Sequence, residues 1–185
     1  GVKKGDFVIC QSLTFVGSAN PILYCNAEPI FIDSERETWN MCPVLLDKAI
    51  NDLLKINKKP KAIILVHLYG MPAKIKEIKE ISKKYEIPLI EDAAEALGSY
   101  IKTKKYNHCG SIGDIGCLSF NANKIITTGS GGAIITNNKR FYERAQYLAN
   151  QSKDDTFNYI HNECGYNYKL NSICAALGIS QLRNS

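Results

Sequence analysis

Three polar side chains in the middle of the sequence could together perform covalent chemistry. Asp92 ends the apolar run PLIED, where a partly buried carboxylate needs a cationic or hydrogen-bonding partner. Lys124 lies between an apolar run and a Thr-Thr-Gly-Ser-Gly-Gly turn, where its amine could form a Schiff base with a carbonyl. Ser119 precedes this lysine by five residues and could donate its hydroxyl to a phosphate.

Each of these residues also has an ordinary structural explanation. Asp92 could be the N-cap of a helix over the segment AAEAL. Ser119 could bond to the backbone, and Lys124 could be a surface residue. The glycines after Lys124 permit a tight turn, but their spacing is neither G-x-G-x-x-G nor a Walker A motif.

Taken together, the three residues predict a site for pyridoxal phosphate. An acid binds the pyridine nitrogen of that cofactor, a lysine its aldehyde and a hydroxyl its phosphate. Here the acid follows a predicted strand, and the serine and then the lysine come after it, the lysine 32 residues downstream. The combination is a stronger indication than any one of the residues.

The elements that must position these residues alternate between strand and helix patterns. Short runs rich in Ile and Val predict strands, and apolar residues at i, i+3, i+4 and i+7 predict helices. The predicted strands are 7–10, 29–33, 62–67, 88–92, 117–120 and 132–136. The predicted helices are 44–54, 75–85, 141–148 and 172–182.

This alternation predicts an α/β fold with a mainly parallel sheet and helices on both faces. Ligands of such sheets bind at the carboxyl ends of the strands. Asp92, Ser119 and the segment 11–15 all follow predicted strands, so we expect them at that edge. His67 also follows a strand, and we interpret it as a histidine at the rim of the sheet with satisfied hydrogen bonds, not as a catalyst.

Composition excludes several classes of function. The net charge is +5, but the lysines are scattered in pairs and form no basic stripe, so we expect no nucleic-acid partner. The seven cysteines are odd in number and lack metal-ligand spacing, which argues against disulfides and against a metal site. No apolar run approaches the roughly 18 residues of a membrane span. We therefore expect a cytoplasmic protein that does not bind a membrane.

Three segments resemble the DegT/DnrJ/EryC1/StrS family of sugar aminotransferases, which are fold-type I pyridoxal phosphate enzymes. They are EDAAEALGS (91–99), GDIGCLSFNANKIITTGSGGAIITN (113–137) and GYNYKLNSICAALGISQL (165–182). The segments SFNANKIITT and YIHNECGYNYKLN look most like members that aminate carbon 4 of nucleotide-linked sugars. The resemblance implies transfer of an amino group from L-glutamate to C4 of a nucleotide-linked 4-keto-6-deoxy sugar. Amination at C3 is the alternative.

The resemblance also implies roles for single residues. Lys124 matches the lysine that forms the Schiff base, Asp92 the partner of the pyridine nitrogen, and Ser119 a ligand of the phosphate. Asn167 matches an asparagine that reaches the cofactor phosphate of the neighbouring subunit. The resemblance therefore implies a homodimer with shared active sites.

Two further positions match cofactor-binding residues less closely. Glu95 stands where many members have Gln, at the residue that reaches toward the ring hydroxyl of the cofactor. Phe15 matches the aromatic residue that stacks on the pyridine ring, although a plain core aromatic is the alternative. The family also commonly has Glu, Gly and Arg where this chain has Ser130, Ala122 and Lys169.

Members of the family are about twice as long as this chain. The resemblance thus implies that residues 1–185 are the central part of the large cofactor-binding domain, without the N-terminal segment and the C-terminal small domain. An inactive fragment, or a module that only binds cofactor, is the alternative to an active enzyme.

Overall fold

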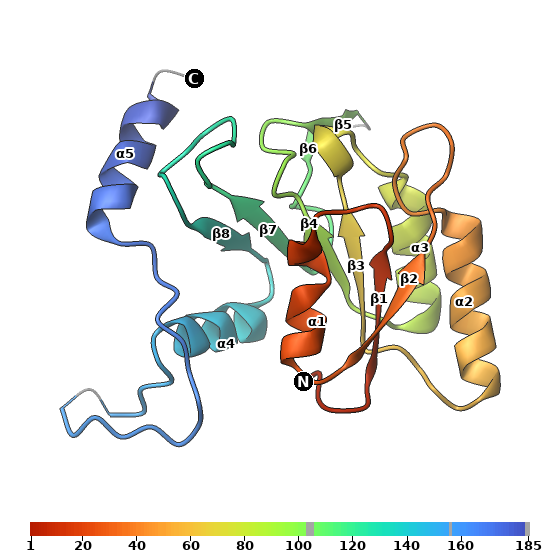
Figure 1. The fold of residues 1–185 in the computed structure, drawn as a ribbon, viewed down its shortest axis with the longest axis horizontal. Coiled ribbons are helices and arrows are strands. Elements are labelled where there is room, and N and C mark those ends of the chain that lie inside the picture. The colour runs from red at the N-terminus through yellow and green to blue at the C-terminus, as the bar shows by residue number, and fades with distance from the viewer. Residues whose placement is uncertain (103–105, 156, 184–185) are drawn as a thin grey trace.

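A six-stranded sheet forms the centre of the computed structural model, which describes residues 1–102, 106–155 and 157–183 (Figure 1). The strand order is β2-β1-β3-β4-β7-β8, in which the first five strands are parallel and β8 is antiparallel to β7. The strands are β1 (Phe7–Gln11), β2 (Glu28–Ile32), β3 (Ala62–Val66), β4 (Leu89–Asp92), β7 (Ile115–Ser119) and β8 (Gly132–Ile135). The predicted α/β fold with a mainly parallel sheet is confirmed.

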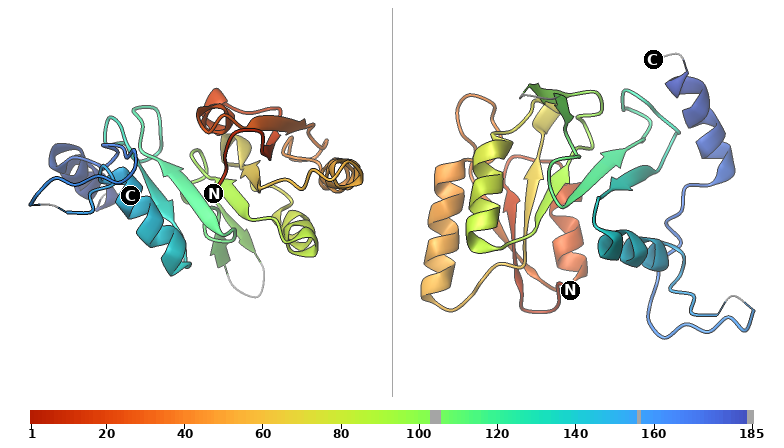
Figure 2. Two further views of the ribbon diagram at one scale, coloured as in Figure 1. Left: turned by 90° about the horizontal axis from the view of Figure 1, so that it is seen from below. Right: turned by 180° about the vertical axis from the view of Figure 1, so that it is seen from behind.

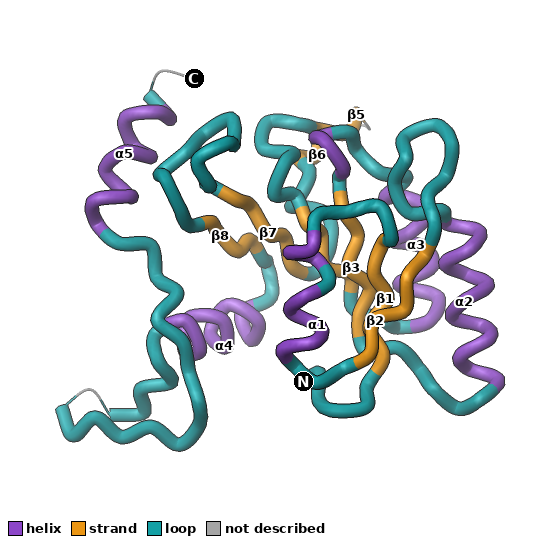
Figure 3. The backbone as a smooth tube through the Cα atoms, in the orientation of Figure 1, coloured by secondary structure: helices purple, strands orange, loops and turns teal. Residues whose placement is uncertain are grey.

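The helices follow the predicted pattern, with three short elements that it did not include (Figure 3). The predicted helices correspond to α2 (Pro43–Lys55), α3 (Ile75–Tyr85), α4 (Lys139–Ala149) and α5 (Ser172–Leu182). The additional helical elements are η1 (Val16–Ser18), α1 (Asn20–Tyr24) and η2 (Leu68–Gly70). A two-stranded hairpin of β5 (Tyr100–Lys102) and β6 (Tyr106–His108) was also not predicted.

Both faces of the sheet are covered, and side-chain alternation divides the core between them (Figure 2). On one face, Ile63 and Leu65 of β3 pack with residues of α2 and α3 in the larger buried cluster. On the other face, Cys10 and Ile64 pack with Ile22 of α1. Because β3 is buried on both faces, its sequence AIILV is apolar throughout.

The same alternation separates the two acids at the end of β4. Leu89 of β4 belongs to the cluster on the α2 and α3 face, so Glu91, two residues on, points to that side. Asp92 points to the α1 face. The register places Asp92 beside Val66 of β3 and beside Cys117 of β7. The carboxyl ends of these strands therefore form one edge, and the predicted site residues follow them.

The C-terminal part of the chain extends away from the sheet (Figure 1). Helix α5 contacts the loop between β7 and β8: the backbone N–H of Thr127 donates to Gln181 Oε1 at 2.8 Å. This helix exposes several large apolar side chains, among them Ile173, Leu177 and Ile179. None of the helices in the described ranges has the length and apolar character needed to cross a membrane.

Candidate active site

Asp92 is held by two hydrogen bonds at the carboxyl end of β4. Its Oδ1 accepts from the backbone N–H of Ala94 at 3.1 Å, and its Oδ2 accepts from Ser18 Oγ at 2.5 Å. The segment that follows forms turns, so the prediction that Asp92 could cap a helix over AAEAL is wrong. The side chain of Ser18 fixes the carboxylate toward the α1 face instead.

The surroundings of Asp92 leave its negative charge uncompensated. Burial, with the nearby charge of Asp92 as the second cause, raises the pKa of Cys10 to about 12 and that of Cys117 to about 11. Both thiols are therefore protonated at neutral pH. Within the described ranges, no lysine, arginine or histidine forms an ion pair with this carboxylate. A cationic ligand would supply the missing positive charge.

Lys124 and Glu95 meet at the same edge of the sheet. Lys124 Nζ lies 3.7 Å from Glu95 Oε1, and the lysine side chain is only 18% exposed. The other carboxylate oxygen of Glu95 accepts from the backbone N–H of Tyr69 at 2.8 Å. Glu95 thus joins the loop after β7 to the turn after β3.

The turn that presents this Tyr69 N–H needs an unusual backbone. Tyr69 has a φ of 53°, and Gly70 follows it with a φ of 81°. A Cβ atom at Gly70 would lie 3.0 Å from the carbonyl oxygen of Glu95. Glycine therefore allows η2 to approach the segment after β4, and left-handed backbone at two successive residues is the kind of strain that functional sites retain.

Ser119 ends β7, next to the loop that carries Lys124. Its Oγ accepts from the backbone N–H of Asn121 at 3.3 Å. The hydroxyl hydrogen has no acceptor among the described hydrogen bonds, so it is available to a ligand. The glycine-rich turn beyond Lys124 is as tight as predicted, because Gly129 and Gly131 have φ values of 80° and 101°.

Phe15 lies just after β1 and is 79% exposed. Within residues 1–185, Phe15 therefore does not pack into the core of the sheet. Its backbone carbonyl accepts from the N–H of Ser18 at 3.1 Å, which closes the turn that carries the serine to Asp92. An exposed ring three residues before Ser18 is available to stack on a ligand held by Asp92.

Asn167 lies outside this cluster. It pairs with Asn150 in an isolated antiparallel bridge in the C-terminal part of the chain. No hydrogen bond or ion pair within the described ranges connects it to Asp92, Ser119 or Lys124. Five of the six predicted site residues thus lie at or after the carboxyl ends of β1, β4 and β7, whereas Asn167 lies in the C-terminal part of the chain beside Asn150.

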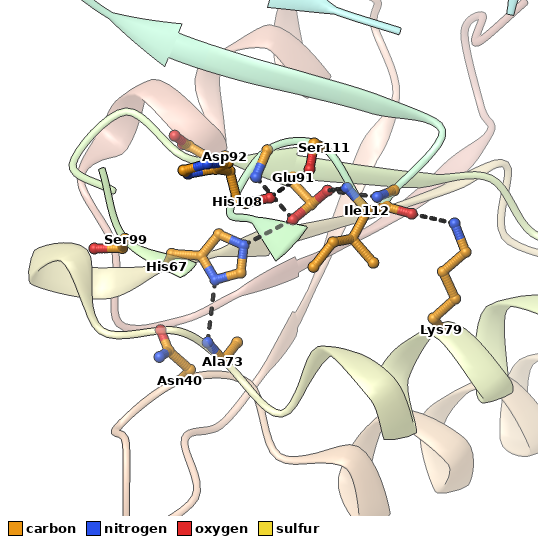
Figure 4. Close-up of polar contacts among 12 residues, drawn as sticks. Asn40, His67, Ala73, Lys79, Glu91, Asp92, Ser99, His108, Ser111 and Ile112 are labelled. Atoms are coloured by element: carbon orange, nitrogen blue, oxygen red, sulfur yellow. Dashed lines mark hydrogen bonds and ion pairs between the residues drawn. The ribbon is translucent and has the colours of Figure 1, made fainter. Parts of the chain in front are cut away.

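Sequence reasoning missed a buried polar network on the opposite face, centred on Glu91 (Figure 4). Glu91 accepts from His67 Nε2 at 2.9 Å and from three backbone N–H groups of the 110–113 loop. The N–H of Ala73 donates to His67 Nδ1 at 3.1 Å, so the ring hydrogen is on Nε2 and points to Glu91. His67 is thus satisfied as interpreted, and although it directly follows β3 at the edge of the sheet, its side chain is fully buried.

This network predicts a pH-dependent contribution to stability. Burial alone would raise the pKa of Glu91, but the hydrogen bonds from His67, Gly113 and Gly110 lower it below its ordinary 4.5. The contribution is therefore complete above pH 4.5 and decreases as the pH falls below that value. We expect Glu91→Gln to lower the free energy of unfolding by about 3 kcal/mol at pH 7, because the amide cannot accept all four hydrogen bonds.

Urea denaturation at several pH values measures this effect. Glu80→Gln is the matched control, since Glu80 is exposed on α3 and its change should stay within about 0.5 kcal/mol. The deficit of Glu91→Gln should shrink as the pH is lowered below 4.5, because the wild-type protein then loses the contribution of its charged carboxylate. A deficit that stays constant as the pH falls and wild-type stability declines would contradict this role of the Glu91 charge.

Comparison with known proteins identifies the family. The family model of the DegT/DnrJ/EryC1/StrS aminotransferases matches residues 1–185. The chain belongs to this family. The fold agrees: a DegT/DnrJ/EryC1/StrS aminotransferase from Brucella abortus superposes with a TM-score of 0.91 at 31% identity, over 99% of this chain and 48% of that structure.

Two relatives illustrate how far the sequence match extends. EpsN of Bacillus subtilis, whose name assigns it to the pyridoxal phosphate-dependent aminotransferases, is 49% identical over 98% of this chain and 46% of its own length. GDP-perosamine synthase of Escherichia coli O157:H7 is 43% identical over 100% of this chain and 48% of its own length. The chain thus spans about half the length of the curated relatives it matches.

The names of other relatives refer to amination at two different carbons of the sugar. A Campylobacter jejuni UDP-4-amino-4,6-dideoxy-N-acetyl-beta-L-altrosamine transaminase is 37% identical over 99% of this chain and 47% of its own length. A Pseudomonas aeruginosa UDP-2-acetamido-2-deoxy-3-oxo-D-glucuronate aminotransferase is 34% identical over 98% of this chain and 48% of its own length. Members of the aminotransferase family similar to this chain are therefore named for nucleotide sugars aminated at C4 and at C3.

The residues of this DegT/DnrJ/EryC1/StrS chain fit pyridoxal phosphate. Asp92 provides an anion without a counter-charge among the described residues, which suits a protonated ring nitrogen. Lys124 provides a half-buried amine, and Ser119 provides a hydroxyl with an available hydrogen. The three groups lie on neighbouring strands β4 and β7 or on the loop that follows them. This donor set matches the ring nitrogen, aldehyde and phosphate of the cofactor.

Proposed function

We propose that the protein that carries this chain uses pyridoxal phosphate to transfer an amino group from L-glutamate to C4 of a nucleotide-linked 4-keto-6-deoxy sugar. The observation that supports this most is the meeting of Lys124 and Glu95 at 3.7 Å, at the same edge of the sheet as the carboxylate of Asp92, which has no described ion pair. The 4-keto-6-deoxy sugar and the donor L-glutamate rest on the sequence resemblance. We place the reaction in the cytoplasm.

Lys124 has two tasks in this proposal. Bound pyridoxal phosphate supplies an aldehyde and an electron-accepting ring. The amine of Lys124 would hold that aldehyde and, when free, would accept and return the proton of the amino acid α-carbon. Glu95 holds the amine close to the end of β4, because its other oxygen is fixed by Tyr69 N–H.

The other residues of the edge bind and orient the cofactor. Asp92 keeps the ring nitrogen protonated, since its charge has no other described partner. Ser119 donates its free hydroxyl hydrogen to the phosphate. Phe15 covers the ring face from the turn after β1. Residues 1–185 are, in this proposal, the central part of the large cofactor-binding domain.

We further propose that Asn167 completes the phosphate site of a second subunit in a homodimer. Its pairing with Asn150, without a described contact to Lys124 or Asp92, supports a role outside its own subunit's site. The neighbouring Tyr166 and Tyr168 are stacked with ring centroids 4.9 Å apart and are exposed, which suits a surface that pairs with another subunit.

Mixing two inactive variants tests the shared site. A Lys124→Ala chain and an Asn167→Ala chain should together recover about a quarter of wild-type activity, because half of randomly formed dimers contain one site with an intact lysine and an intact asparagine. A mixture of Lys124→Ala with Asp92→Asn is the control and should recover nothing, since both residues serve the same subunit's site. A mixture no more active than the average of its two components would overturn the shared site.

The reaction itself is tested in two stages. The visible absorption band of the bound cofactor should bleach when L-glutamate is added, and a band that persists would favour the alternative that the chain only binds cofactor. NMR of the product made from a nucleotide-linked 4-keto-6-deoxy sugar should then show nitrogen on C4. If only a 3-keto sugar reacts and the nitrogen is found on C3, the alternative specificity is established. The name of the Pseudomonas aeruginosa relative describes such a 3-oxo substrate.

A further inference from the structure

The carboxylate of Asp92 is fixed by a serine far away in the sequence. Ser18 lies at the end of η1, is 4% exposed, and donates from Oγ to Asp92 Oδ2 at 2.5 Å. The backbone N–H of Ala94 holds the other oxygen. Each oxygen of the carboxylate therefore has one protein donor, and the donor on Oδ2 is a side chain that can be changed.

The direction of the next hydrogen bond follows from the number of hydrogens. Ser18 Oγ also lies 2.8 Å from Thr14 Oγ1. A hydroxyl has a single hydrogen, and Ser18 uses its own for Asp92, so Thr14 must donate to Ser18. The three side chains form a directed chain from Thr14 to Ser18 to Asp92, in which the first bond polarises the second.

No stronger donor competes with Ser18 for this carboxylate. The two nearest thiols, Cys10 and Cys117, have pKa values raised to about 12 and about 11 and remain protonated. In the part of the chain that the structure describes, no cation forms an ion pair with Asp92. The serine hydroxyl therefore has a large share in how the negative charge is distributed and in how the carboxylate is oriented.

We propose that Ser18, polarised by Thr14, is a positioning residue that orients Asp92 and limits how far its carboxylate draws the proton from the pyridine nitrogen of the cofactor. This inference rests on the proposed function. A carboxylate with a donor on each oxygen cannot rotate, and it has less electron density to share with the ring N–H. Without Ser18 the carboxylate loses its orientation and takes a larger share of that proton.

Four variants test the proposal in the purified protein. Ser18→Ala removes the donor and Ser18→Thr keeps a hydroxyl, while Thr14→Val removes only the polarising bond. Ser82→Ala is the matched control, since Ser82 is similarly buried and donates to the carbonyl of Ile87 at 2.7 Å, in a turn that contacts no predicted site residue. For each, we measure the dissociation constant of pyridoxal phosphate and the ¹⁵N chemical shift of the bound, ring-labelled cofactor.

Ser18→Ala should bind pyridoxal phosphate about tenfold more weakly, because the carboxylate of Asp92 is no longer held in the orientation that meets the ring nitrogen and must be ordered on binding. Its ¹⁵N shift should move toward that of unprotonated pyridine. Ser18→Thr should restore both values, Thr14→Val should move both by a smaller amount, and Ser82→Ala should change stability alone. The ¹⁵N chemical shift of the bound cofactor distinguishes a positioning role of Ser18 from a general loss of folding.

Wild-type affinity and shift in Ser18→Ala would overturn the inference, as would equal changes in Ser82→Ala. If Ser18→Ala does not fold, Thr14→Val decides, and an unchanged ¹⁵N shift in that variant overturns the chain of hydrogen bonds. A wild-type protein that binds no pyridoxal phosphate would instead refute the proposed function. The two failures are therefore distinguishable in the same set of measurements.

Discussion

Lys124→Ala should abolish covalent attachment of pyridoxal phosphate and lower amino transfer by at least about three orders of magnitude. The amine of Lys124 is the one that the structure places with Glu95 at the carboxyl edge of the sheet. A methyl group at this position can neither attach the aldehyde nor move the proton of the amino acid. The visible absorption band of the bound cofactor reports attachment, and a coupled assay of product formation reports the rate.

Lys74→Ala is the control for this change. Lys74 is also partly buried and is paired with carboxylates, since its Nζ lies 3.2 Å from Glu35 and 3.0 Å from Glu37. Its loss should leave both the cofactor band and turnover close to wild type, because no described ion pair joins Lys74 to Glu95 or Asp92. Retained covalent attachment in Lys124→Ala would show that another lysine holds the cofactor.

Asp92→Asn should fold normally and lose activity by orders of magnitude. The amide has the shape of the carboxylate and can still accept a hydrogen bond from Ser18 or Ala94. It has no charge, so the ring nitrogen is no longer held protonated and the ring withdraws electrons less strongly. Near-normal turnover in this variant would mean that Asp92 only stabilises the turn that follows it.

Two further measurements strengthen this test. Asp114→Asn is the matched control, because Asp114 Oδ2 accepts from Leu89 N–H at 2.8 Å at the opposite end of β4, and its change should leave turnover intact. Titration of the cysteine thiols gives a readout that does not need the cofactor. In Asp92→Asn the pKa of Cys117 should fall below about 11 but stay above 9, because burial, the larger cause of its shift, remains.

The sequence predicts well where Asp92 and Ser119 lie, because each ends an apolar run that forms a strand, and the carboxyl ends of parallel strands meet at one edge. Lys124 lies in the loop that follows Ser119. Side-chain alternation in LIED could likewise have separated Glu91 from Asp92. The long helices were also predictable, since α2 and α3 bury regularly spaced residues such as Leu46, Ile50 and Ile78.

Contacts between distant segments could not be predicted in the same way. Ser18 and Asp92 are 74 residues apart, and nothing in the periodicity near Ser18 indicates that its hydroxyl reaches β4. The helix considered over AAEAL does not form, although alanine and glutamate favour helices, because the segment turns back to place Glu95 against Tyr69 N–H. The network around His67 likewise depends on a loop, 110–113, that has no regular pattern.

Reduction of the holoprotein with borohydride, followed by peptide mapping, tests the central claim most directly. Borohydride fixes the cofactor to the amine that carries it, and mass spectrometry then locates the modified residue. We expect a pyridoxyl group on the peptide that contains Lys124 and on no other lysine peptide. A pyridoxyl group on a different lysine would contradict this assignment. So would an unmodified protein that binds the cofactor and transfers amino groups.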